Sequence, residues 1–110
     1  MIDPFKRAAA VYVDVDGTLA RHAGSQAIPI ANVVAQVRRL HERGFPLYCW
    51  STGGADYARR IATELGVADC FAAFLPKPTI LIDDQEMPVW LLKSFHPMDI
   101  DDDSIDAYLP

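Results

Sequence analysis

The chain has 110 residues, a formal net charge of −5 and 51% hydrophobic residues. This length gives room for one domain over 1–110, and a domain of this size buries roughly two-thirds of its unfolded surface without disulfide staples. The acidic balance argues against a large nucleic-acid footprint. We therefore expect a single globular domain.

Cysteine usage and the N-terminus point to a cytoplasmic protein. Cys49 and Cys70 stand inside apolar runs without metal-ligand spacing, which favours buried free thiols in a reducing compartment. Residues 1–8 are a polar lead-in in which Asp3 and Pro4 interrupt any signal-peptide pattern. Because no apolar run is long enough to span a bilayer, we expect no membrane partner.

The first half of the chain predicts a strand, a loop, a helix and a second strand. The β-branched and aromatic run over 9–15 indicates a buried strand. Residues 20–28 show no clear period and predict a loop or a small flap. Apolar residues at helical spacing predict a helix that starts at Pro29 and stops at Gly44. The run 45–50 is typical of a second buried strand.

The second half predicts one more helix and further strands. A second apolar helical face ends at Gly66, and 70–75 is interpreted as a short third strand or a partly irregular segment. The β-branched run 79–82 predicts a fourth strand. We interpret 88–95 as a last strand in preference to a short helix. The acidic tail from Asp99 is expected to form one helical turn or to fray.

Alternation of strands and helices through short loops predicts an α/β domain. Such a chain makes right-handed crossovers and a mostly parallel sheet covered on both faces. Ligands bind at the carboxyl ends of the strands in sheets of this type. Polar residues follow four predicted strand ends, namely Asp14 with Asp16, Ser51 with Thr52, Lys77, and Asp83 with Asp84.

Each of these groups alone is explained by a turn, a helix cap or a solvated loop. Together they favour phosphoryl transfer. Acids from two strand ends suit a hard cation such as Mg²⁺. A hydroxyl and the backbone amides near Gly53, at the start of the second helix, suit phosphate oxygens, and a lysine offsets the remaining charge. A carboxylate is then a plausible nucleophile.

The order and spacing of these residues resemble the haloacid dehalogenase (HAD) superfamily of phosphohydrolases over essentially the whole chain. The stretch Asp14-Val15-Asp16-Gly17-Thr18-Leu19 matches the first family motif almost letter for letter. Ser51 matches the second motif, with Thr52 as an alternative, Lys77 matches the third, and Asp83-Asp84 matches the acidic fourth. The resemblance implies a three-layer, Rossmann-like (HAD-like) α/β domain with a mostly parallel sheet.

The resemblance also implies a role for each acidic residue. Asp14 would attack phosphorus and form an aspartyl-phosphate, and Asp16 would act as general acid and then general base. An Asp at this second position implies a phosphatase. Mg²⁺ would be bound by Asp14, the backbone carbonyl of Asp16, and Asp83 or Asp84, with Asp83 favoured for direct contact.

The remaining candidate residues concern the substrate. By the resemblance, Ser51 would hydrogen-bond a phosphoryl oxygen and Lys77 would neutralise the nucleophile and the intermediate. The intervals between motifs leave no room for a cap domain, so the residues that choose the substrate are few. Arg21 and His22 stand just beyond the nucleophile turn and are either substrate contacts or a solvated loop pair.

These observations favour a Mg²⁺-dependent phosphatase that hydrolyses a phosphomonoester, with a small-molecule substrate. One alternative is a polynucleotide 3′-phosphatase, which the acidic balance and the lack of an aromatic and basic patch disfavour. Another is a non-enzymatic module of the same fold that binds phosphate or Mg²⁺. Trp90 and Phe95 would suit a homo-oligomer, although core burial explains them equally well.

Overall fold

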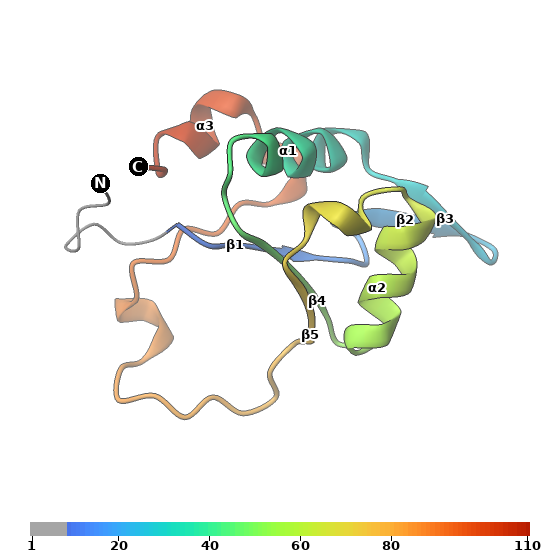
Figure 1. Ribbon diagram of the computed structural model, residues 1–110. Coiled ribbons are helices and arrows are strands. Elements are labelled where there is room, and N and C mark those ends of the chain that lie inside the picture. The colour runs from blue at the N-terminus through green and yellow to red at the C-terminus, as the bar shows by residue number, and fades with distance from the viewer. Residues whose placement is uncertain (1–8) are drawn as a thin grey trace.

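Three parallel strands form the central sheet, in the order β1 (Val11–Asp14), β4 (Leu47–Ser51) and β5 (Ala73–Pro76). This computed structural model describes residues 9–110 (Figure 1), and the polar lead-in expected at 1–8 lies outside them. The first three predicted strands are confirmed with ends shifted by one to three residues. The protein is thus an α/β domain with a mostly parallel sheet.

Two helices link these strands, α1 (Ala31–Glu42) before β4 and α2 (Ala55–Glu64) before β5. Both connections step in the same direction across the sheet, so right-handed crossovers place both helices on one face. The hydrophobic core lies between that face and the two helices. Its buried members include Val13, Leu47, Cys49, Val33, Val37, Leu40, Ala58, Ile61 and Ala62.

The start of α1 differs from the prediction. Pro29 is the last residue of a strand, and Ile30, whose amide donates to the Leu19 carbonyl at 3.0 Å, is the residue before the helix. The predicted stop is confirmed, because Gly44 follows the helix at φ +86°, a value that favours glycine. None of the helices within residues 9–110 is long and apolar enough to cross a bilayer.

Residues 20–28 form a hairpin where the sequence predicted a loop or flap. β2 (Ala20–Ala23) pairs with β3 (Gln26–Pro29) in antiparallel register. Gly24, at φ +61°, occupies the first turn position, where a positive φ is needed. Most of the hairpin side chains are exposed, so the strands lack the alternation of apolar and polar residues that would have revealed them.

The other face of the sheet carries a row of aromatic side chains. The Tyr12 ring stacks on Tyr48 at 5.0 Å between centroids and meets Trp50 edge-on at 4.8 Å. Tyr12 is 47% exposed. We expected a sheet covered on both faces. Within the described residues, α1 and α2 share one face, the C-terminal helix packs against α1, and Tyr12 on the other face stays exposed.

The stretch after β5 does not form the predicted fourth strand. Residues 79–82 lie in irregular backbone, with Ile80 and Ile82 79% and 95% exposed. The stretch swings away from the sheet before it returns toward α1 (Figure 1). The strand interpretation of 88–95 is also wrong, because this segment is irregular after a short 3₁₀ turn. The helical turn expected in the tail is confirmed as α3 (Asp102–Asp106).

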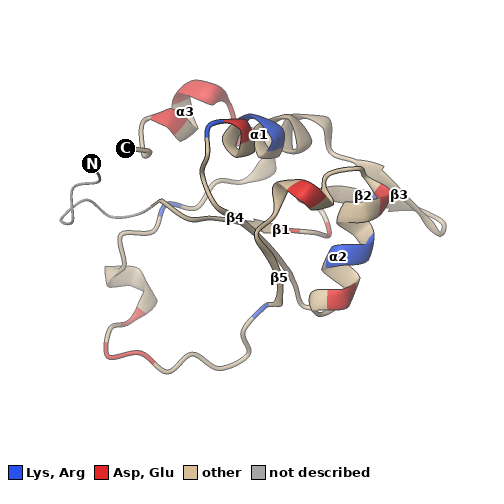
Figure 2. Cartoon of the chain, in the orientation of Figure 1, with Lys and Arg blue, Asp and Glu red and all other residues tan. Residues whose placement is uncertain are grey.

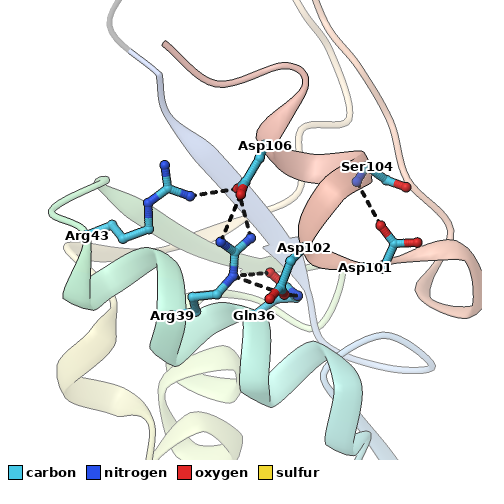
Figure 3. A network of polar contacts seen from close by, with 7 residues as sticks. All are labelled: Gln36, Arg39, Arg43, Asp101, Asp102, Ser104 and Asp106. Carbon is cyan, nitrogen blue, oxygen red and sulfur yellow. Dashed lines mark hydrogen bonds and ion pairs between the residues drawn. The ribbon is translucent and has the colours of Figure 1, made fainter.

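A network of charged side chains fastens α3 to α1 (Figure 3). Asp106 accepts hydrogen bonds from Arg39 Nη2 at 3.0 Å and from Arg43 Nη1 at 2.6 Å. Asp102 forms an ion pair with Arg39 Nε at 3.1 Å and accepts a hydrogen bond from Gln36. The hydrogen bonds from Arg39 and, to a smaller extent, Arg43 hold the pKa of Asp106 below its usual value. The acidic tail is therefore a docked element.

Candidate active site

Asp14 and Asp16 stand on either side of Val15, at the end of β1. The Val15 carbonyl accepts hydrogen bonds from the backbone amides of residues 18–20 at 2.9 to 3.1 Å, which closes a tight turn. Gly17 lies in this turn at φ +77°, where a side chain would be strained. Because Val15 is fully buried, it anchors the turn and leaves both carboxylates at the carboxyl end of the sheet.

Lys77 and Thr18 both contact the Asp14 carboxylate. Lys77 Nζ lies 3.4 Å from Asp14 Oδ1, and Thr18 Oγ1 donates to Oδ2 at 3.3 Å. The Lys77 amide donates to the Ser51 carbonyl at 2.9 Å, which fixes this lysine directly after β5. The Asp14 side chain stays 31% exposed, so a ligand can reach it.

The two hydroxyl residues at the end of β4 differ in accessibility. Ser51 is 1% exposed, and its Oγ accepts a hydrogen bond from the Gly53 amide at 3.0 Å. Because strand residues alternate, Ser51 shares the helix-covered face with Cys49, whereas Asp14 belongs to the other face. Thr52 is exposed in the turn that follows. Of the two predicted phosphate contacts, Thr52 has the more accessible side chain.

Asp16 is held by two side chains from other elements. Tyr57, on α2, donates its hydroxyl to Asp16 Oδ1 at 2.6 Å, and His22 Nε2, on β2, lies 2.9 Å from the same oxygen. The hydrogen bond to Asp16 raises the pKa of Tyr57 to about 12, with burial adding to the effect. The sequence did not predict Tyr57 as a site residue, because it lies on an ordinary amphipathic helix with no motif around it.

The side chains of Arg21 and His22, the candidate substrate contacts, point in opposite directions because neighbouring residues of a strand alternate. His22 turns toward Asp16, as its contact shows. Arg21 instead lines a cavity of about 260 Å³, together with Gly17 and His96. The guanidinium is thus the member of the pair that remains available to an anionic group beside the nucleophile turn.

The second acid pair is not brought to the first. Asp83 and Asp84 are exposed in the stretch after β5, and Asp83 Oδ1 accepts a hydrogen bond from the Gln85 amide at 2.8 Å. Figure 2 shows this acidic stretch on the segment that leaves the sheet. Within residues 9–110, no three Asp, Glu, His or Cys side chains gather to hold a metal. Asp14 and Asp16 offer hard oxygen donors, but the residues as they lie do not complete the expected Mg²⁺ site.

Comparison with protein-family models, with curated proteins and with solved structures returned no match. The assignment therefore depends on the residues and their geometry. What the geometry brings together is Asp14, Lys77 and Thr18 on one side of the turn, and Asp16, His22 and Tyr57 on the other.

Proposed function

We propose that the protein is a phosphatase of the HAD superfamily that hydrolyses a phosphomonoester through an aspartyl-phosphate on Asp14. The observation that carries the proposal is the Asp14 carboxylate at the strand end, partly exposed and contacted by Lys77 at 3.4 Å. A carboxylate beside a fixed cation can approach a phosphoryl group whose own negative charge would otherwise repel it. The proposal includes a three-layer HAD-like core and a cytoplasmic location.

Two proton-balanced steps describe the reaction. An Asp14 oxygen attacks phosphorus, the bond to the ester oxygen breaks, and Asp16 gives its proton to the leaving oxygen. Water then attacks the aspartyl-phosphate, Asp16 takes the proton from that water, and inorganic phosphate leaves with Asp14 restored. Lys77 offsets negative charge in both steps, and the Thr52 hydroxyl can donate to a phosphoryl oxygen.

Mg²⁺ is the cofactor that this proposal includes. When bound at such a site, a divalent cation offsets charge on the transferring phosphoryl group. Asp14 and the carbonyl of Asp16 would be among its ligands. Asp83 and Asp84 lie apart from them, so neither has a role in the two steps.

The substitution Asp14→Asn tests the proposed reaction. It keeps the shape of the side chain but removes the nucleophilic charge, so we expect the kcat for p-nitrophenyl phosphate with Mg²⁺ to fall on the order of 10³-fold or more. Asp69→Asn, an exposed carboxylate on a different part of the chain, is the matched control and should keep full activity. A well-folded wild-type protein without turnover in Mg²⁺ or Mn²⁺ would contradict the proposal.

The same assay separates the alternative functions. A 3′-phosphorylated oligonucleotide turned over far faster than sugar phosphates would favour a polynucleotide 3′-phosphatase, against the net charge of −5. Binding of phosphate or Mg²⁺ by calorimetry without turnover would favour the non-enzymatic module. The incomplete cluster of acids is the observation that keeps this last alternative in the test.

A further inference from the structure

We propose that Tyr57 and His22 are positioning residues that fix the Asp16 carboxyl group for proton transfer. This inference rests on the proposed function, because it assigns the support of the proposed acid and base. It concerns one oxygen of the side chain. Oδ1 is held by both partners, and Oδ2 is left to carry and exchange the proton.

The three side chains form a closed triangle. The Tyr57 hydroxyl lies 2.6 Å from Asp16 Oδ1, His22 Nε2 lies 2.9 Å from that oxygen, and the hydroxyl and Nε2 are 3.0 Å apart. Asp16 is 53% exposed in its side chain, so without partners its carboxyl group would sample several rotamers. Two contacts to one oxygen remove that freedom before any substrate arrives.

The three members come from separate parts of the fold. Asp16 belongs to the nucleophile turn, His22 to the hairpin and Tyr57 to α2. Each contact therefore depends on the packing of one element against another. A side chain held from two elements keeps its orientation better than one held within its own turn, which is the requirement for a proton-transfer group.

The absence of a side chain at Gly53 independently supports the observed position of the Tyr57 ring. A Cβ added to Gly53 would lie 2.8 Å from Tyr57 Cδ2 and 3.1 Å from its Cγ. Gly53 is not among the glycines at positive φ, so its backbone does not require glycine. The missing side chain leaves room for the ring, and the ring in that place directs its hydroxyl to Asp16.

Because Oδ1 of Asp16 is occupied by Tyr57 and His22, Oδ2 is the oxygen that can face the substrate. Within the described residues, the polar contacts of the Asp16 side chain are all made through Oδ1. A proton given to a leaving oxygen must sit on an oxygen that can face the substrate. The two oxygens of the Asp16 carboxyl group thus have different roles: Oδ1 binds Tyr57 and His22, and Oδ2 transfers the proton. In this role Tyr57 and His22 act through their contacts with Asp16.

Leaving-group dependence tests this assignment. We compare kcat/KM for phenyl phosphate and p-nitrophenyl phosphate in Tyr57→Phe, His22→Gln and Gly53→Ala, because kcat/KM reports only the steps up to departure of the leaving group. Phenolate is the more basic leaving group and needs the proton from Asp16, whereas p-nitrophenolate leaves with little help. In Tyr57→Phe we expect kcat/KM for phenyl phosphate to fall about 10- to 100-fold, a part of the general-acid contribution, and kcat/KM for p-nitrophenyl phosphate to fall less than about threefold. In His22→Gln and Gly53→Ala the ratio of the two values should change in the same direction.

Matched controls are Tyr108→Phe and His41→Gln, which make the same chemical changes at exposed positions elsewhere. An equal loss on both substrates in Tyr57→Phe would show a merely structural role and overturn the assignment, as would no loss on either. Hydrogen exchange of the amides of residues 20–28 gives a readout independent of turnover. It should be faster in Tyr57→Phe than in wild type, because the hairpin loses its contact with α2.

The two proposals fail in different ways. Wild-type protein with no turnover defeats the proposed function and, with it, the proton-transfer role of Tyr57 and His22. Faster hairpin exchange in Tyr57→Phe would then still show the contact, as a purely structural one. Full turnover in wild type, with the ratio of the two substrates unchanged in all three variants, defeats the positioning role alone.

Discussion

Strand alternation decides the chemistry available to single residues at the end of β4. Cys49 and Ser51 point to the covered face and are 0% and 1% exposed. Burial, with a smaller contribution from the charge of Asp14, raises the pKa of the Cys49 thiol to about 12. Only the thiolate is a strong nucleophile, so Cys49 behaves as a small apolar core residue although it lies near Asp14.

The two cysteines should therefore differ in reactivity. Cys70 is half-buried, so we expect it to be modified by a thiol reagent such as DTNB in the folded protein at pH 8, while Cys49 reacts only after unfolding. Burial also raises the pKa of Cys70, so its reaction should be slower than that of a free thiol. Cys70→Ser should abolish labelling of the folded protein and Cys49→Ser should leave it unchanged. Labelling of Cys49 under native conditions would contradict this assignment.

At the scale of elements, burial separates what could be predicted from what could not. α1 has a 3.6-residue apolar pattern that packs on the sheet, and its pattern was enough to find it. Residues 79–82 are also apolar, but no element of the described chain covers them and they form no strand. A pattern shows which side chains could be buried, whereas the sequence alone does not show whether a neighbouring element is there to bury them.

The candidate site follows the same division. Asp14 and Lys77 could be predicted to meet, because they follow parallel strands that share a sheet. The position of Asp83 depended on the strand 79–82, and the expected convergence failed with that strand. The contact of Tyr57 with Asp16 could not be predicted, because it joins two elements through tertiary packing and leaves no local pattern in the sequence.

The docking of α3 on α1 should depend on pH in a defined direction. The pKa of Asp106 is lowered from 3.8 by its hydrogen bonds to Arg39 and Arg43, so the folded state favours the carboxylate. Its contribution is fully present above the unfolded pKa and is lost as the pH falls below 3.8 through the lower folded value. We expect the protection of the α3 amides from hydrogen exchange, measured against their intrinsic rates at each pH, to fall over that range. Asp106→Asn should show a modest loss of protection already at pH 7.

Asp103→Asn is the matched control on the same helix, because its side chain is exposed and outside the network of Figure 3. High salt should reproduce part of the Asp106→Asn effect, since exposed ion pairs are screened. Equal exchange rates in wild type and Asp106→Asn at pH 7 would show that apolar contacts such as that of Ile105 hold α3 in place.

At the scale of the whole molecule, the two faces of the sheet are covered unequally. One face is buried by α1 and α2, and the other presents Tyr12 beside Trp50. The proposed three-layer core would need a further layer over this aromatic face. Trp90 and Phe95, which suit either a core or an oligomer, are half-buried within the chain, so homo-oligomer formation stays a prediction.

Metal binding should stabilise the whole fold if Mg²⁺ is the cofactor. A ligand at about 100 times its Kd adds about 2.7 kcal/mol to the free energy of unfolding. For a domain of this size, that corresponds to a rise in Tm of roughly ten degrees. We expect this rise in wild type and its loss in Asp14→Asn, measured by calorimetry with Mg²⁺ and with EDTA.

Substitutions in the second acid pair show whether Asp83 or Asp84 binds the metal. Asp83 and Asp84 lie outside the site in the structure, so metal binding through either one requires the stretch after β5 to move toward Asp14. We expect Asp83→Asn to reduce the Mg²⁺-dependent rise in Tm more than Asp84→Asn. Glu86→Gln, an exposed acid on the same stretch, is the matched control. An equal rise in all three variants would show that the metal is held by Asp14 and Asp16 with water, without the second acid pair.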